Sequence, residues 1–262
     1  MPEPAVRYRL LVFDWDGTLA DSTSLIAGAI QQTCRDLGLP APDDRSARHV
    51  IGLGHRDAIT LVAPTLPAAD VARFSERYRT HYLVGDADIP LFEGVRDMLD
   101  ELDRRGFLLG VATGKSRAGL TRALAQHGIG HHFVASRCAD ETFPKPHPEM
   151  LLSLMERAGV TAGETLMIGD TTHDLDLARN AGVRAVAVAY GAHPAAGLAA
   201  LGPSQPCIRS QNYARGWRTT PDLRQRRAAR GRRRRSLRRA IGRCYAAGVC
   251  DSLARCSPRL SE

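Results

Sequence analysis

The chain has 262 residues, a formal net charge of +8 and 44% hydrophobic residues. This length is enough for one or two domains with a proper core, so folding requires neither disulfides nor a structural metal. No apolar run approaches the ~20 residues of a membrane helix, and the first residues lack the pattern of a secretory leader, so we expect a cytoplasmic protein without a membrane partner.

The positive charge is confined to the C-terminal part of the sequence. Residues 206–262 hold sixteen arginines and three acidic residues, a net +13, whereas residues 1–205 carry −5. Only seven of these 57 residues are Leu, Ile, Val or Phe, which predicts a disordered tail. Its arginine-rich, lysine-free composition is typical of an out-of-frame reading of a GC-rich gene, so we hypothesise a frameshift. Alternatively, the tail binds nucleic acid or another anionic surface.

The first predicted elements are a strand and a group of helices. The apolar run 8–13 predicts a buried strand. Helical spacing of apolar residues follows at 25–37, 56–62 and 69–83, with Ser22, Thr23 or Ser24 as N-cap and Gly38 as the end of the first helix. Because residues 43–84 contain no strand pattern, we expect residues 21–88 to form an inserted helical domain.

From residue 94 onward, helical and strand patterns alternate. Helices are predicted over 94–105, 116–127, 148–158 and 174–181, and strands over 107–112, 132–135, 165–168 and 185–189. Such alternation predicts a parallel sheet covered by helices on both faces. The fold class is therefore α/β, a Rossmann-like doubly wound sheet formed by residues 1–20 and 89–205. The pattern fades after Pro194.

Charged motifs follow three of the predicted strands. The motifs are Asp14-Trp15-Asp16-Gly17-Thr18, Thr113-Gly114-Lys115 and Gly169-Asp170-Thr171-Thr172-His173-Asp174, and Lys145-Pro146-His147-Pro148 precedes a helix. Ligands of open parallel sheets bind at the carboxyl ends of the strands, so we expect these groups to converge. Four carboxylates in one crevice are costly to desolvate unless they are paired or metal-bound. The sequence therefore predicts a functional site.

These motifs carry a family resemblance. Asp-x-Asp-Gly-Thr, Thr-Gly, Lys-Pro-x-Pro and Gly-Asp-x-x-x-Asp, in this order, resemble the motifs of the haloacid-dehalogenase superfamily of phosphohydrolases. The resemblance covers about residues 7–205 and is strongest to phosphoglycolate-phosphatase-like members. Within it, the helical insertion is similar to the cap domain of that superfamily, which sets substrate choice.

The resemblance implies an activity and a role for each matching residue. It implies a Mg²⁺-dependent phosphatase that hydrolyses a small phosphorylated metabolite, 2-phosphoglycolate first of all, through an aspartyl-phosphate. Asp14 is the implied nucleophile, Asp16 the general acid and base, and Lys145 the cation that neutralises Asp14 and the phosphoryl group. The implied metal ligands are Asp14, Asp16, Asp170 and Asp174, and the implied substrate-binding residues are Thr113, Gly114 and Arg56.

Structural roles are the alternative for several of these residues. Thr113 could cap a helix, Asp174 could stabilise the first turn of one, and Arg56 could be a surface residue. We expect Lys115, His147 and His173 to be solvated. A sugar phosphomutase of the same superfamily is the alternative function, because it uses the same aspartate pair, whereas Asp16 and Asp170 together argue against a dehalogenase.

Overall fold

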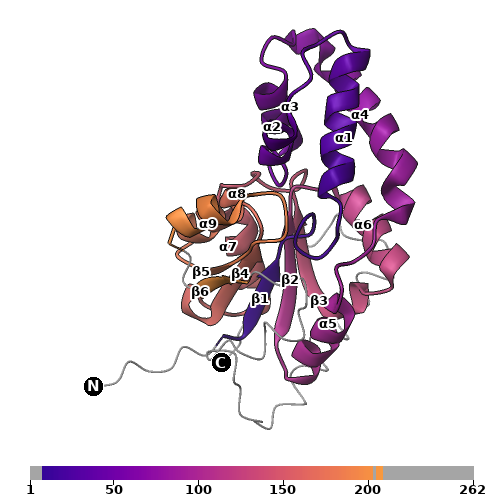
Figure 1. Ribbon diagram of the computed structural model, residues 1–262. Helices are drawn as coiled ribbons and strands as arrows, with labels where there is room; N and C mark the ends of the chain where they lie inside the picture. The colour runs from indigo at the N-terminus through magenta and orange to yellow at the C-terminus, as the bar shows by residue number, and fades with distance from the viewer. Residues whose placement is uncertain (1–7, 203–204, 209–262) are drawn as a thin grey trace, which may run out of the picture. The chain divides into compact units, whose positions relative to one another are not determined.

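A parallel β-sheet lies at the centre of the computed structural model, which describes residues 8–202 and 205–208. Within this described part, six strands pair in the order β3-β2-β1-β4-β5-β6 (Figure 1). They are β1 (Leu10–Phe13), β2 (Leu108–Thr113), β3 (Phe133–Cys138), β4 (Thr165–Gly169), β5 (Arg184–Val188) and β6 (Gln205–Ile208). The described residues belong to one unit, residues 1–225, and the second unit, residues 226–262, lies outside them.

Helices cover both faces of the sheet. Successive side chains of a strand point to opposite faces, so each face carries apolar side chains that the helices bury. Leu11 and Phe13 of β1 belong to the hydrophobic cluster that includes α5 (Val95–Arg104) and α6 (Arg117–His127). Leu10 and Val12 belong to the cluster of α7 (Glu149–Ala158) and α8 (Thr172–Asn180). The predicted doubly wound α/β fold is confirmed.

The segment between β1 and α5 forms a helical layer at the carboxyl ends of the strands (Figure 1). Its helices are α1 (Thr23–Asp36), α2 (Asp44–His49), α3 (His55–Val62) and α4 (Val71–Gly85), with short 3₁₀ helices η1 (Ala68–Asp70) and η2 (Asp86–Asp88). Asp36 of α1 binds both Arg77 and His81 of α4, at 2.6 and 2.7 Å. We call this layer the cap and keep 21–88 as its proposed limits.

The structure corrects the expectation for the C-terminal end of the core. The composition predicts disorder from residue 206 onward, but residues 206–208 belong to β6, which pairs in parallel with β5. Helix α9 (Ala195–Ala200) precedes it and has a single leucine in six residues, too few for a visible helical pattern. The predicted disorder, the frameshift hypothesis and the nucleic-acid alternative concern mainly residues 209–262. These residues lie outside the described part of the chain.

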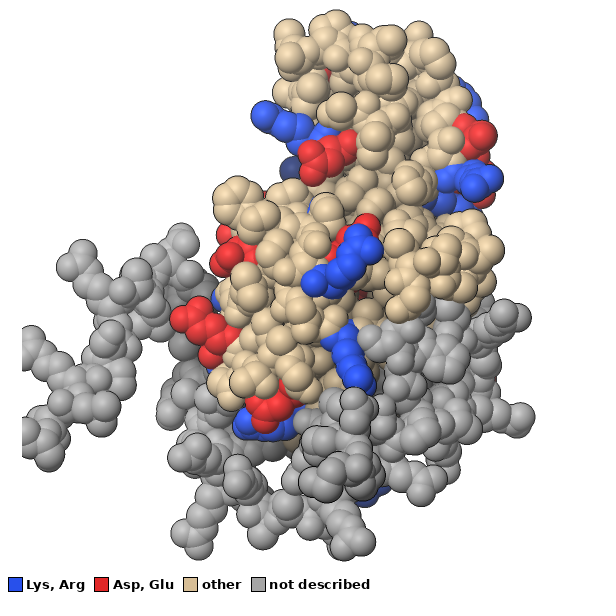
Figure 2. All heavy atoms as spheres, turned by 90° about the vertical axis from the view of Figure 1, so that its left-hand side faces the viewer, with Lys and Arg blue, Asp and Glu red and all other residues tan. Residues whose placement is uncertain are grey.

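On one face of the described residues, charged side chains are dispersed (Figure 2). Figure 2 shows basic and acidic groups on one face as single groups or neighbours of opposite sign, separated by uncharged residues. Exposed ion pairs such as Arg48–Asp44 and Arg179–Asp176 are of this kind. In the part of the chain that the structure describes, no helix is long and apolar enough to cross a membrane.

Candidate active site

The candidate site lies where β1, β2 and β4 end. The chain crosses to opposite sides of β1 to form β2 and β4, and such a switch point is where open α/β sheets bind ligands. Asp14 directly follows β1, Asp170 directly follows β4, and Thr113 ends β2, all of them fully buried. The carboxylates of Asp14, Asp170 and Asp174 offer oxygens within 4.8 Å of one another. The structure thus brings these predicted residues together.

Lys145 lies between two of these carboxylates. It precedes α7, and its Nζ is 2.9 Å from Asp14 Oδ1 and 2.7 Å from Asp174 Oδ1, with all three side chains fully buried. Burial by itself lowers the pKa of Lys145, but the charges of Asp14 and Asp174 outweigh burial and raise this pKa above its ordinary value. Lys145 is therefore a buried cation.

Asp14 presents one unpartnered oxygen. Its Oδ1 accepts hydrogen bonds from the Trp15 N–H, at 2.6 Å, and from Lys145. Its Oδ2 is buried and accepts no hydrogen bond from the described residues. Burial, together with the charges of Asp174 and Asp170, raises the pKa of Asp14 well above its usual value despite the opposing effect of Lys145. A buried carboxylate oxygen without a partner is costly, so Oδ2 is the atom that a cation or substrate would contact.

Asp170 is held by two hydrogen bonds from other parts of the core. Its Oδ1 accepts from the Thr18 hydroxyl and its Oδ2 from the Ala192 N–H, both at 2.7 Å. Burial first, and then the charge of Asp174, raises the pKa of Asp170 to about 7. A side chain at Gly17 would collide with this carboxylate, so the turn after β1 needs glycine for space as well as for its φ of +79°.

Asp174 has the helix-end role weighed from the sequence and also binds Lys145. Its Oδ2 accepts from the N–H and the hydroxyl of Thr171, at 3.0 and 2.7 Å, and so completes the capping box of α8. Its Oδ1 binds Lys145. The helix-end interaction therefore orients the carboxylate that fixes the lysine. Thr113 does not cap α6, because Ser116 does so.

The cluster fits a divalent cation. Three buried carboxylates, Asp14, Asp170 and Asp174, share one buried lysine, which leaves two negative charges in excess when all three are ionised. The donors are oxygens, which Mg²⁺ prefers, and the unpartnered Asp14 Oδ2 provides a free ligand atom. Uncompensated buried charge of this kind is strongly unfavourable, and a bound cation would offset it.

We expect the contribution of Asp170 to the stability of the metal-free protein to be lost as pH rises from about 4 to about 7. Folding raises the pKa of Asp170 from 3.8 to about 7, so the fold favours the protonated carboxyl. This contribution to stability is complete below the unfolded pKa and is lost as pH passes the folded pKa. Mg²⁺ should reverse the loss and stabilise the protein by about 2.7 kcal/mol at a hundredfold excess over its Kd.

Thermal unfolding between pH 4 and 8, with and without Mg²⁺, measures both effects. Asp170→Asn should reduce the pH dependence and the response to Mg²⁺. Asp176→Asn, on the outer part of α8, should change neither. An equal response to Mg²⁺ in Asp170→Asn and in the unmodified protein would exclude Asp170 as a ligand.

Asp16 lies beside the cluster and is bound by two residues with unexpected roles. Ser22 occupies the N-cap position of α1, yet its hydroxyl donates to Asp16 Oδ1 at 2.7 Å instead of capping the helix. Lys115 Nζ lies 2.9 and 3.2 Å from the two carboxylate oxygens and 2.7 Å from the Tyr82 hydroxyl. The prediction that Lys115 is solvated is wrong, because Tyr82 of the cap helps to cover it and only 9% of its side chain is exposed.

One sequence signal pointed to Lys115. The chain has two lysines among 36 basic residues, and both bind carboxylates of this site. A bias toward arginine elsewhere makes a retained lysine informative. For Tyr82, by contrast, no motif in the sequence marked a role.

The cap lies against the site. A Cβ placed on Gly52 would be 3.8 Å from Asp14 Oδ2, and one on Gly114 would be 2.7 Å from the Leu53 carbonyl oxygen. On the other side, Nε2 of His173 and of His193 lie 2.8 and 3.0 Å from the carbonyl oxygen of His49 in the cap. His173 is thus not a solvated residue as expected, because it contacts the cap, whereas His147 is exposed.

We expect Gly114→Ala to lower kcat/KM by roughly ten- to a hundredfold, because the added methyl group would meet the Gly52 and Leu53 carbonyls and hold the cap away. Steady-state kinetics and thermal unfolding separate this effect from misfolding. Gly163→Ala is the matched control, since a Cβ there has no heavy atom within 4 Å. Unchanged kinetics in Gly114→Ala would show that this close approach is not needed for turnover.

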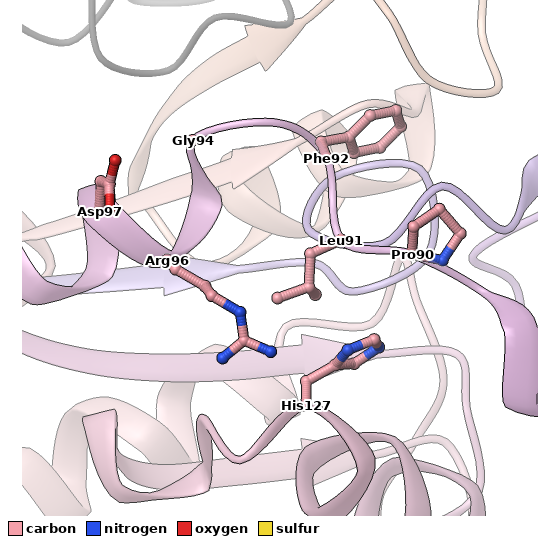
Figure 3. Close-up of a pocket in the computed structure, with 7 residues that line it drawn as sticks. All are labelled: Pro90, Leu91, Phe92, Gly94, Arg96, Asp97 and His127. Carbon is pink, nitrogen blue, oxygen red and sulfur yellow. The ribbon is translucent and has the colours of Figure 1, made fainter.

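Arg56 is the predicted site residue that the structure does not bring to the others. It is exposed in the first turn of α3 and is not among the residues that line the cavity between cap and core. Its role as a carboxylate clamp stays a prediction. A second cavity of about 340 Å³ lies beside α5, where Figure 3 shows Arg96 and His127 directed toward the same hollow. None of the predicted site residues lines it.

Comparison with known proteins agrees with the fold and the motifs. Residues 11–188 match the haloacid dehalogenase-like hydrolase family, and the chain belongs to this family. A protein of Dickeya dadantii named "Probable phosphatase IndB" is 38% identical over 74% of this chain and 86% of that protein. The phosphoglycolate phosphatase of Agrobacterium fabrum is 32% identical over 70% and 81%. The crystal structure of a predicted phosphoglycolate phosphatase from Haemophilus somnus superimposes with a TM-score of 0.66 at 25% identity, over 75% and 92% of the two chains. The predicted phosphoglycolate-phosphatase-like resemblance is confirmed.

Proposed function

We propose that this enzyme is a Mg²⁺-dependent phosphatase that hydrolyses a small phosphomonoester through a phosphoryl group carried by Asp14. The observation that carries the proposal is the unpartnered, buried Oδ2 of Asp14 beside the Lys145 cation and the carboxylates of Asp170 and Asp174. Mg²⁺ held by Asp14, Asp170, Asp174 and the main-chain carbonyl of Asp16 would supply positive charge for the transferring phosphoryl group.

The proposed reaction has two steps. A carboxylate oxygen of Asp14 attacks phosphorus, the bond to the ester oxygen breaks, and Asp16 gives its proton to that leaving oxygen. Asp16 then takes a proton from a water molecule that attacks phosphorus, which releases inorganic phosphate and restores Asp14. Ser22 and Lys115 hold the Asp16 carboxylate in place between these steps.

Charge is the main obstacle to the first step. Each unit-charge repulsion between a carboxylate and a phosphate at ~4 Å amounts to ~4 kcal/mol at an effective dielectric of ~20. Lys145 lies 2.9 Å from Asp14 and offsets part of this repulsion. The Thr113 hydroxyl and the Gly114 N–H, at the end of β2, would hold the phosphoryl oxygens.

Phosphate release from a panel of phosphomonoesters, with Mg²⁺ and with chelator, tests this proposal. We expect release that depends on Mg²⁺ and ranks the substrates by kcat/KM. If a phosphoryl group passes to a sugar phosphate rather than to water, the enzyme is the alternative phosphomutase. Folded protein that releases no phosphate from any ester would contradict the proposed function.

The names of relatives make 2-phosphoglycolate the first ester to include in the panel. A location in the cytoplasm stays a prediction. The alternative of nucleic-acid binding concerns residues 206–262, of which the structure describes the backbone of 206–208 only.

A further inference from the structure

A cavity of about 430 Å³ lies between the cap and the core, next to Asp16. From the core it is lined by Asp16, Gly114 and Lys115, and from the cap by residues of α1, α3 and α4. Because Asp16 is the proposed proton donor to the leaving oxygen, the group attached to that oxygen has to enter this cavity. This step rests on the proposed function, and the lining of the cavity then defines the class of substrate.

The cap contributes a predominantly apolar lining. Ile30, Val50, Ile59 and Phe74 line the cavity and come from three helices and one loop, and each is no more than 5% exposed in the chain. A substrate body that enters between these side chains leaves water for an apolar surface, which favours uncharged hydrocarbon. The volume is sufficient for a group the size of a phenyl ring.

Each lysine or arginine that lines this cavity is either paired with a carboxylate or exposed to solvent. Lys115 lines it, but both oxygens of Asp16 already bind its Nζ. Arg122 and Arg79 also line it, but Arg122 pairs with Asp86 and Arg79 is exposed on α4. Desolvation lowers the pKa of His55, which disfavours its charged form. A carboxylate desolvated without a partner weakens binding strongly.

We propose that the preferred substrate is the phosphomonoester of an alcohol with an uncharged, mainly apolar body, rather than phosphoglycolate. Tyr78, which lines the same cavity, carries a hydroxyl group that could give such a body one polar contact. The carboxylate-bearing ester is disfavoured by the lining and not by size, since it is smaller than the cavity.

A pair of esters with the same shape tests the proposal. Isobutyl phosphate has two methyl groups where phosphoglycolate has two carboxylate oxygens. We expect kcat/KM for isobutyl phosphate to be at least about tenfold higher, and phenethyl phosphate to be better still. A higher kcat/KM for phosphoglycolate would overturn the proposal while leaving the enzyme a phosphatase.

Binding without turnover separates this proposal from the proposed function. In isopentylphosphonate and phosphonopropionate a methylene group replaces the bridging oxygen of the two esters, so neither can be hydrolysed there. We expect calorimetry in the presence of Mg²⁺ to give at least about tenfold tighter binding of isopentylphosphonate. Tighter binding of phosphonopropionate would overturn the proposal, even if no ester were hydrolysed.

Variants locate the preference in the cavity. Val50→Thr places a hydroxyl group in the lining at nearly constant volume, and should lower kcat/KM for isobutyl phosphate roughly fivefold relative to phosphoglycolate. Val84→Thr, at a position 82% exposed, should leave the ratio unchanged. Arg79→Gln should also leave it unchanged, whereas a selective loss of phosphoglycolate turnover in Arg79→Gln would show that the cavity recruits a cation for carboxylates and would overturn the proposal.

Discussion

Replacing Asp14 with asparagine is expected to lower kcat for phosphate release by at least about a thousandfold, because the amide cannot form the aspartyl-phosphate. The side chain keeps its shape, so the Trp15 N–H retains an acceptor. One of three clustered carboxylates also disappears, and burial raises the pKa of Asp14 in the fold. We therefore expect the variant to be as stable as the unmodified protein or more so near pH 7.

Two further measurements make the Asp14→Asn result specific. Asp97→Asn removes an exposed carboxylate from α5, away from the carboxyl ends of the strands, and should leave kcat unchanged. Thermal unfolding of Asp14→Asn should show a folded protein. Phosphate release by folded Asp14→Asn at the normal rate would remove this residue from the reaction.

Replacing Lys145 with methionine is expected to lower the free energy of unfolding by about 3–5 kcal/mol, the range for breaking a buried ion pair. Lys145 is fully buried and binds Asp14 and Asp174 together. Without it, both carboxylates lose their cation, and the surroundings of Asp170 become more negative. The loss should be largest above pH 7 and should shrink at low pH, because protonated carboxyls no longer need a cation.

Urea unfolding of paired variants measures this effect. Arg157→Met removes an exposed cation from α7 and should change stability little. Asp174→Asn combined with Lys145→Met should recover part of the loss, since it removes one uncompensated charge. If Lys145→Met unfolds at the same urea concentration as the unmodified protein, the buried ion pairs do not stabilise this fold.

The sequence was sufficient for the sheet and for the position of the site. Strand β1 is a short apolar run directly followed by Asp14, and β4 is another directly followed by Asp170. A charged residue directly after a buried strand lies at the carboxyl end of that strand. The carboxyl ends of parallel strands lie along the same side of the sheet, so such residues come close together. The arrangement of Asp14 and Asp170 could therefore be anticipated, whereas the role of Lys145 was implied by the family resemblance.

The contacts between cap and core could not be predicted in the same way. Lys115 is separated from Tyr82 by 33 positions, and their contact depends on how α4 lies over the end of β2. Ser22 has the sequence context of a helix cap, yet Asp16 is a nearby acceptor for its hydroxyl. Strand β6 was missed because four residues are too few to show alternation, and its place is set by pairing with β5.

Acid-quenched single turnover, followed by mass spectrometry of the digested protein, tests the central claim most directly. In the presence of Mg²⁺ and excess enzyme over isobutyl phosphate, we predict a transient phosphoryl group on the peptide that contains Asp14. Asp14→Asn should give no such adduct. The account would be contradicted if phosphate were released at the single-turnover rate with no adduct at any time, and if Asp14→Asn released phosphate at the same rate.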